Sequence, residues 1–163
     1  LGEVVAINTR SLAVDRRIPT GDVCSNGIAV GEGAVWVSNT CDGSVLKIDP
    51  RSGATTRITV GGDPSDIGIG FGSVWVSNMD GTQTRIDPES GRIEDVIAIG
   101  KASDSMVSGS VPAAGYMWAT SPSTKSIVWI DPAKNDVEGR IHLPYSPLRI
   151  VAAFGSIWVT VAT

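Results

Sequence analysis

A five-residue pattern built around a tryptophan recurs four times along this chain. The copies are spaced 39, 43 and 40 residues apart: Gly33-Ala34-Val35-Trp36-Val37, Gly72-Ser73-Val74-Trp75-Val76, Gly115-Tyr116-Met117-Trp118-Ala119 and Gly155-Ser156-Ile157-Trp158-Val159. A second series keeps nearly the same spacing: Ile48-Asp49-Pro50, Ile86-Asp87-Pro88, Ile130-Asp131-Pro132 and the degenerate Ile7-Asn8-Thr9. Two interleaved series with one period indicate a repeat architecture.

Each repeat contains four short apolar and β-branched runs separated by turn residues, which predicts four antiparallel strands and no helix. In the best-defined repeat the strands are expected at Gly27–Gly31, Ala34–Asn39, Ser44–Asp49 and Ala54–Val60. A two-residue X-Gly turn joins the first strand to the second, Asp-Gly joins the second to the third, and Asp-Pro-x-Ser-Gly joins the third to the fourth.

One such sheet leaves two apolar faces uncovered, so the copies must pack against one another. Radial packing of sheets of about forty residues each is the β-propeller solution. The sequence therefore predicts a single all-β propeller domain over residues 1–163, with four blades near 23–62, 63–100, 101–144, and 145–163 joined to 1–22. The repeated tryptophans are expected to pack between blades rather than to bind a ligand.

The fourth blade is divided between the two ends of the chain. Third and fourth strands are predicted at Glu3–Asn8 and Ala13–Pro19, and first and second strands at Pro147–Ala153 and Ser156–Val161. The halves either meet within one molecule and close a four-bladed ring, or pair with those of a second chain in a two-fold symmetric, eight-bladed ring. A third interpretation is a fragment of a longer propeller. The start at Leu1, without an initiator Met or a signal peptide, fits a processed form or a piece of a longer protein.

Charge and hydropathy exclude two kinds of partner. The net charge is −4, and Lys and Arg are scattered singly, so there is no basic stripe for nucleic acid. No apolar run approaches the roughly 18 residues that a membrane-spanning helix needs.

The two cysteines lie on opposite sides of the turn at Glu32-Gly33. A two-residue turn there pairs residues whose numbers sum to 65, which places Cys24 directly across from Cys41. We expect a disulfide, with two buried thiols as the alternative. A disulfide would indicate an extracellular, periplasmic or cell-envelope location, because the cytoplasm is reducing.

Candidate ligand-binding residues come from the links that share one face of a propeller, the face on which ligands usually meet the central channel. Those expected near the channel are Asn26, Ser65, Asp66, Ser103, Asp104, Ser105 and Arg149, and those farther out are Asn39, Asp42, Asn78, Asp80, Ser121, Ser123 and Tyr145. Their oxygen atoms suit Mg²⁺ or Ca²⁺, while Asn and Asp also serve turns themselves. No cofactor is expected and no metal-ligand set is assigned, with Mg²⁺ or Ca²⁺ kept as an alternative.

No catalytic set can be identified from the sequence. The single histidine, His142, lies near the end of a predicted outer strand, and neither a zinc motif nor a phosphate-binding loop is present. Carboxylates or a metal-bound water would have to carry any catalysis.

The units at 33–53 and 72–91, which run from Gly-Ala-Val-Trp-Val or Gly-Ser-Val-Trp-Val to Ile-Asp-Pro-x-Ser-Gly, resemble the repeats of the bacterial virginiamycin B lyase-like and YVTN-type propellers. The resemblance covers essentially the whole chain. It implies a secreted or periplasmic propeller, and for some members a lyase that opens a cyclic ester antibiotic with Mg²⁺ and a catalytic histidine. Such lyases are seven-bladed, whereas this chain has four repeats, and no catalytic residue matches by position.

Three functions follow from these observations. The favoured one is a secreted or cell-envelope module that binds a protein or a small molecule, as part of a larger assembly or as a homodimer. The alternatives are a metal-assisted lyase or hydrolase and a structural scaffold without a ligand.

Overall fold

Antiparallel sheets account for nearly all regular structure in the computed structural model, which describes residues 2–21, 24–102 and 109–162. Sheet 1 consists of β3 (Ser25–Gly31), β4 (Ala34–Asn39), β5 (Ser44–Ile48) and β6 (Thr55–Thr59). Sheet 2 consists of β7 (Pro64–Gly70), β8 (Ser73–Asn78), β9 (Thr82–Ile86) and β10 (Ile93–Ala98). Sheet 3 consists of β11 (Ser110–Ala113), β12 (Tyr116–Ser121), β13 (Ser126–Asp131) and β14 (Asp136–His142). The prediction of an all-β chain with four-stranded antiparallel sheets is confirmed.

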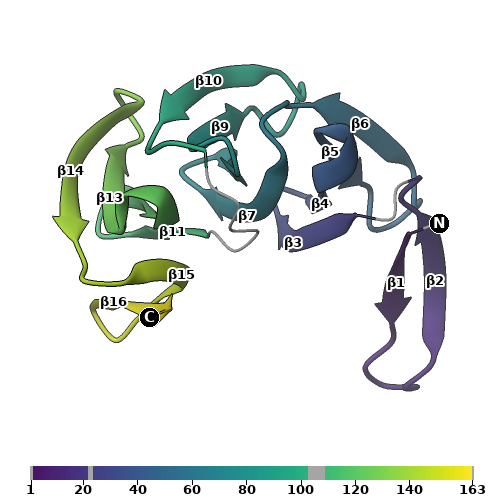
Figure 1. Ribbon diagram of the computed structural model, residues 1–163. Helices are drawn as coiled ribbons and strands as arrows, with labels where there is room; N and C mark the ends of the chain where they lie inside the picture. Colours follow the sequence, from purple (N-terminus) through teal and green to yellow (C-terminus); the bar gives the residue numbers. More distant parts are fainter. Residues whose placement is uncertain (1, 22–23, 103–108, 163) are drawn as a thin grey trace.

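The three sheets stand side by side in an arc (Figure 1). Their first strands, β3, β7 and β11, lie on the concave side, and their last strands, β6, β10 and β14, lie on the convex side. This is the arrangement that blades take around a propeller axis.

The strands of sheet 1 agree with the sequence prediction to within two residues at every end. The expectation of no helix is wrong in detail, because 3₁₀ turns at Thr40–Asp42 and Pro122–Thr124 join the second strand to the third in sheets 1 and 3. Gly43 ends the first turn with φ 64° and donates its N–H to the Thr40 carbonyl. In the described part of the chain, no helix is long and apolar enough to cross a membrane.

The turns between first and second strands are the two-residue turns that the sequence predicts. Both turn residues have positive φ, 50° and 75° at Glu32-Gly33 and 53° and 71° at Phe154-Gly155. This is the type I′ turn, whose twist matches that of the strands it joins.

The core lies between adjacent sheets. Trp36 and Trp75 are fully buried. Trp36 of sheet 1 belongs to one apolar cluster with Ile67, Val74 and Ile86 of sheet 2. Burial of each large apolar side chain contributes about 1.5–3 kcal/mol. For these two tryptophans the predicted packing role agrees with the structure.

The ends of the chain form two separate two-stranded sheets. The N-terminal hairpin consists of β1 (Glu3–Ile7) and β2 (Val14–Pro19), and the C-terminal hairpin of β15 (Ser146–Ala153) and β16 (Ser156–Ala162). They lie at opposite ends of the arc in Figure 1. The structure therefore does not contain the closed four-bladed ring, which was one of the predicted alternatives.

Candidate functional site

The first strands β3, β7 and β15 each have an irregularity near their starts. The pairing register shifts between Ser25 and Ile28 in β3, between Pro64 and Asp66 in β7, and between Pro147 and Ile150 in β15. A bulge of this kind bends a strand and turns a side chain out of the regular alternation.

In three of the repeats, a hydroxyl of the second strand accepts a backbone N–H at the start of the first strand. The backbone N–H of Gly27 donates to Ser38 Oγ at 2.8 Å, and that of Gly109 donates to Thr120 Oγ1 at 2.9 Å. In the C-terminal hairpin the N–H of Arg149 donates to Thr160 Oγ1 at 3.0 Å. These hydroxyls thus hold the backbone at Gly27, Gly109 and Arg149, which share one repeat position. Asp66 occupies the same position in β7.

The two charged residues at this position form an ion pair across sheet 3. Arg149 Nη1 lies 3.3 Å from Asp66 Oδ2, although the residues are 83 positions apart. The Asp66 side chain is 22% exposed and that of Arg149 is 52% exposed. The pair is therefore accessible from the concave side.

The two glycines at this position leave the space that the ion pair occupies. A Cβ at Gly109 would lie 3.1 Å from Asp66 Oδ2 and from Ile150, and a Cβ at Gly27 would lie 2.8 Å from the Asp66 backbone. The contact at Gly27 is closer than real Cβ atoms come, and the contacts at Gly109 would require a neighbour to shift by a few tenths of an ångström. Any side chain at these positions would push against Asp66.

Burial raises the pKa of Asp66 above its ordinary value of 3.8. The hydrogen bond from the Ile67 backbone and the charge of Arg149 act in the opposite direction but do not cancel the desolvation. The site thus holds a carboxyl group with a raised pKa beside a half-exposed guanidinium.

Most of the outer candidates are engaged in their own turns. Asp80 accepts hydrogen bonds from Thr82 N and Thr82 Oγ1, at 3.0 and 2.6 Å. Asp42 pairs with Arg57 and accepts a bond from Ser44 Oγ. These contacts favour the turn role that the sequence left open.

Asn78 is the exception among the outer candidates. Its Nδ2 donates to Thr82 Oγ1 at 2.9 Å and to Thr84 Oγ1 at 2.8 Å, whereas its buried Oδ1 has no hydrogen-bond partner within the described residues. At the same position in sheet 1, Asn39 Oδ1 accepts a bond from Ser25 Oγ at 2.8 Å. Pro64, which pairs with Asn78, replaces that serine and has no donor to offer.

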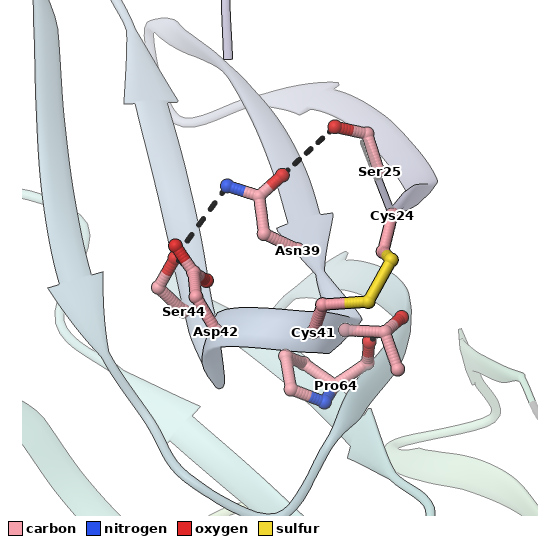
Figure 2. Close-up of a disulfide and its surroundings, with 8 residues drawn as sticks. Cys24, Ser25, Asn39, Cys41, Asp42, Ser44 and Pro64 are labelled. Carbon is pink, nitrogen blue, oxygen red and sulfur yellow. Dashed lines mark hydrogen bonds between the residues drawn. A yellow bond between two sulfur atoms is a disulfide. The ribbon is translucent and has the colours of Figure 1, made fainter. Parts of the chain in front are cut away.

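The disulfide Cys24–Cys41 is present, with a Cα–Cα separation of 5.6 Å. Figure 2 shows it beside Asn39, which is bonded to Ser25 and Ser44. The bulge in β3 shifts the register, so Cys24 precedes the strand and Cys41 lies in the 3₁₀ turn rather than directly across from it. The predicted bridge is confirmed, and its predicted strand register is corrected.

The remaining candidates are dispersed. Asn26 and Tyr145 are exposed, whereas Ser65 is buried and donates to the Ser77 carbonyl. Two others serve links: Ser121 Oγ lies 2.6 Å from Thr124 Oγ1, and Ser123 Oγ accepts the Lys101 N–H. Ser103, Asp104 and Ser105 lie outside the described residues.

The described residues contain no group of three or more His, Cys, Asp or Glu side chains that could hold a metal ion. His142 is the last residue of β14, an outer strand, and is exposed. The sequence prediction named both Asp66 and Arg149 but did not identify them as a pair, nor the glycines that make room for them. The sequence signal that could have identified this site is the repeat position shared by Gly27, Asp66, Gly109 and Arg149.

No protein-family model and no curated protein matches this chain. The predicted resemblance to virginiamycin B lyase-like proteins therefore stays a prediction.

Solved propeller structures do match. The chain is similar to hydrazine synthase of Kuenenia stuttgartiensis, with a TM-score of 0.76 and 20% identity over 91% of this chain and 45% of that chain. It is similar to BamB of Moraxella catarrhalis, with a TM-score of 0.79 and 10% identity over 98% of this chain and 49% of that chain. It is also similar to apo AztD of Citrobacter koseri, with a TM-score of 0.71 and 18% identity over 94% of this chain and 46% of that chain.

These similarities show the β-propeller fold and nothing about activity, since the identities are low. The chain spans somewhat less than half the length of each of these three proteins.

Proposed function

We propose that this chain is a binding and interaction module, a propeller segment with blades near 23–62, 63–100 and 101–144 whose ligand site is the concave face around Asp66 and Arg149. The observation that carries the proposal is the ion pair itself. Its charges come from two inner strands, are fixed at one repeat position and stay accessible to a ligand.

The chemistry of the pair favours a ligand that carries a carboxylate. A guanidinium has five N–H donors, and the contact with Asp66 engages only Nη1. The other donors of a half-exposed Arg149 suit a planar anion. We assign Asn26 and Ser65 to the same proposed face, with Asn39, Asn78, Asp80 and Tyr145 toward its rim.

The disulfide supports a location outside the cytoplasm. Such a bond persists in extracellular, periplasmic and cell-envelope proteins and is rare in a reducing cytoplasm. We therefore place the module in one of these compartments as part of the proposal.

The lyase-like alternative has less support in the donor set. Asp66 pairs with Arg149 and Asp80 with its own turn, so neither is free of competing contacts. A rise in the unfolding midpoint on addition of Mg²⁺ or Ca²⁺, together with turnover of a cyclic ester, would favour the lyase. The scaffold alternative predicts that no anion binds at the concave face.

Side-chain NMR of the arginines during a succinate titration tests the proposed site. We expect the Arg149 Nε–H signal to move, and the binding to be lost in Arg149→Gln. Arg17→Gln is the matched control, because it removes the surface ion pair with Glu3 on the N-terminal hairpin. Equal succinate binding in Arg149→Gln and the unaltered chain would refute the site.

A further inference from the structure

Both ends of the arc expose apolar side chains that are buried at the same positions elsewhere in the molecule. Trp36 and Trp75 are fully buried, whereas Trp158 of the C-terminal hairpin is 56% exposed. Ile67 of β7 is 6% exposed, whereas its counterpart in β3, Ile28, is 59% exposed. These exposures occur where a neighbouring strand pair is missing.

The first exposed surface is an apolar groove between sheet 3 and the C-terminal hairpin. Its volume is about 330 Å³, and it is lined by Trp118, Ile127, Ile141, Leu143, Ile157, Val159 and Val161. Ile141 is 49% exposed, whereas the residues at its position in sheets 1 and 2, Ile58 and Ile97, are 8% and 6% exposed.

The second and third strands of the following sheet contribute to the clusters that contain those two isoleucines. Ile58 clusters with Ile86 of β9, and Ile97 clusters with Val128 and Ile130 of β13. The C-terminal hairpin supplies only a first and a second strand, so no third strand covers Ile141. The groove therefore lies where a third strand, added to β15 and β16, would pack.

Strand β1 has the side chains that this groove lacks. Ile7 stands at the repeat position of Ile86 and Ile130, and it is 63% exposed. Val5, two residues earlier on the same face of β1, is 37% exposed. Both would fill the groove if β1 paired with β16.

The pairing register follows from the three complete sheets. Each repeated tryptophan lies opposite the residue that precedes the isoleucine of the third strand: Trp36 opposite Lys47, Trp75 opposite Arg85, Trp118 opposite Trp129. The same rule places Trp158 opposite Ala6 and Val159 opposite Val5.

The second exposed surface lies at the start of the arc. Ile28 and Val30 of β3 are 59% and 76% exposed. Their counterparts in β7 pack on Ala29 and Trp36 of the preceding sheet. Val151 and Trp158, which pair with each other as Ala29 and Trp36 do, hold those positions in the C-terminal hairpin and are both 56% exposed.

We propose that the partner of this module is a second copy of the same chain, and that each N-terminal hairpin completes a four-stranded blade with the C-terminal hairpin of the other copy. In a two-fold symmetric dimer of this kind, both exposed apolar surfaces are buried, and the two chains form an eight-bladed ring. The hairpins of a single chain lie at opposite ends of the arc and cannot meet without a change in its curvature. Almost the whole chain matches about half of BamB, so two copies have about the length of one BamB chain.

The proposal deepens the proposed function by naming its partner, and its test is independent of the ligand site. Light scattering on the 163-residue chain is expected to give twice 16.9 kDa. A single-chain mass, in a closed four-bladed ring or an open arc, would overturn the proposal, as would an association of any other size. Loss of succinate binding without a change of mass would refute only the ligand site.

Two matched variants test the proposed interface between the C-terminal hairpin of one copy and β3 of the other. Trp158→Glu is expected to give the single-chain mass, because a charge would be buried against Ile28 and Val30. Phe154→Glu serves as its control, since Phe154 is 96% exposed in the turn of the same hairpin. Equal masses for the two variants would contradict the proposed interface.

Cysteine pairs test the register and distinguish two copies from one. The double variant Val5→Cys with Val159→Cys is expected to form a covalent dimer on mild oxidation. Ala6→Cys with Val159→Cys should not, because a shift of one residue turns the side chain to the other face of the sheet. A cross-link within one chain, or equal cross-linking of both variants, would overturn the proposal.

Discussion

Two residues at one repeat position show how a single substitution changes a local hydrogen-bond network. Asn39 and Asn78 are both buried at the ends of second strands, yet only Asn39 has a donor for its Oδ1. Ser25 supplies that donor, and Pro64 stands in its place beside Asn78. An unsatisfied buried acceptor costs about 1–3 kcal/mol.

Restoring the donor is expected to stabilise the fold. Pro64→Ser should be more stable to urea than Pro64→Ala by about 1 kcal/mol, because only serine can donate to Asn78 Oδ1. Both variants lose the proline ring and both keep the carbonyl that accepts a bond from Thr40 Oγ1, so their difference isolates the hydroxyl. Equal unfolding midpoints would show that Asn78 is satisfied in another way.

Asp66 gives the stability of the chain a pH dependence of definite sign. Because its pKa is raised in the folded state, the folded chain binds more protons than the unfolded chain once the pH exceeds about 3.8. The free energy of unfolding therefore falls as the pH rises from 3.8 through the folded pKa.

Asp66→Asn should remove this fall. Urea unfolding of the variant and of the unaltered chain, at several pH values across that window, would measure it. Asp136→Asn, on the exposed edge of sheet 3, is the charge-matched control. A stability difference between Asp66→Asn and the unaltered chain that does not change with pH would contradict the assignment.

At the scale of elements, the turns between third and fourth strands share one capping contact. Asp49 Oδ1 accepts backbone N–H bonds from Arg51 and Ser52 at 2.7 and 2.9 Å. Asn8, the degenerate copy, accepts the equivalent bonds from Arg10 and Ser11. The repeat thus keeps the acceptor even where it loses the charge.

Acid should weaken these turns selectively. Backbone hydrogen bonds lower the pKa of Asp49, chiefly that from Ser52, and the Ser90 hydroxyl and backbone lower the pKa of Asp87. Their contribution is complete above pH 3.8 and is lost as the pH falls through the lower, folded pKa.

The double variant Asp49→Asn with Asp87→Asn keeps both acceptors, as Asn8 does, without titrating. Its melting temperature is expected to fall less steeply than that of the unaltered chain below about pH 4. Thermal unfolding followed by circular dichroism measures this, and parallel curves for the two proteins would refute it.

The strands could be predicted closely because period, β-branched runs and turn residues agree in each repeat. Gly27–Gly31 was predicted too short, since the bulge before Ile28 continues pairing back to Ser25. The contact of Asp66 with Arg149 could not be predicted, because it depends on the arc bringing residues 83 positions apart together across Gly109. The unpaired Oδ1 of Asn78 could not be predicted either, because this requires knowing that Pro64 lies opposite Asn78. No local sequence pattern gives that register.

At the scale of the whole molecule, the arc combines closed units with open ends. Each full sheet consists of strands that are consecutive in the chain, and its core lies against the next sheet. The two hairpins have only one neighbour each, and an isolated two-stranded hairpin is marginal in water.

Because every full sheet uses consecutive strands, folding needs few distant encounters until the ends are reached. The sheets can form in sequence as neighbours are added, which favours fast folding of the centre. In the single chain, amide hydrogen exchange should be slowest in β8 and β9 and fastest in β1 and β16; uniform exchange would show one cooperative unit instead. The order in which the chain gains protection would then run from its middle outward, and its first and last residues would be the last to stop fluctuating.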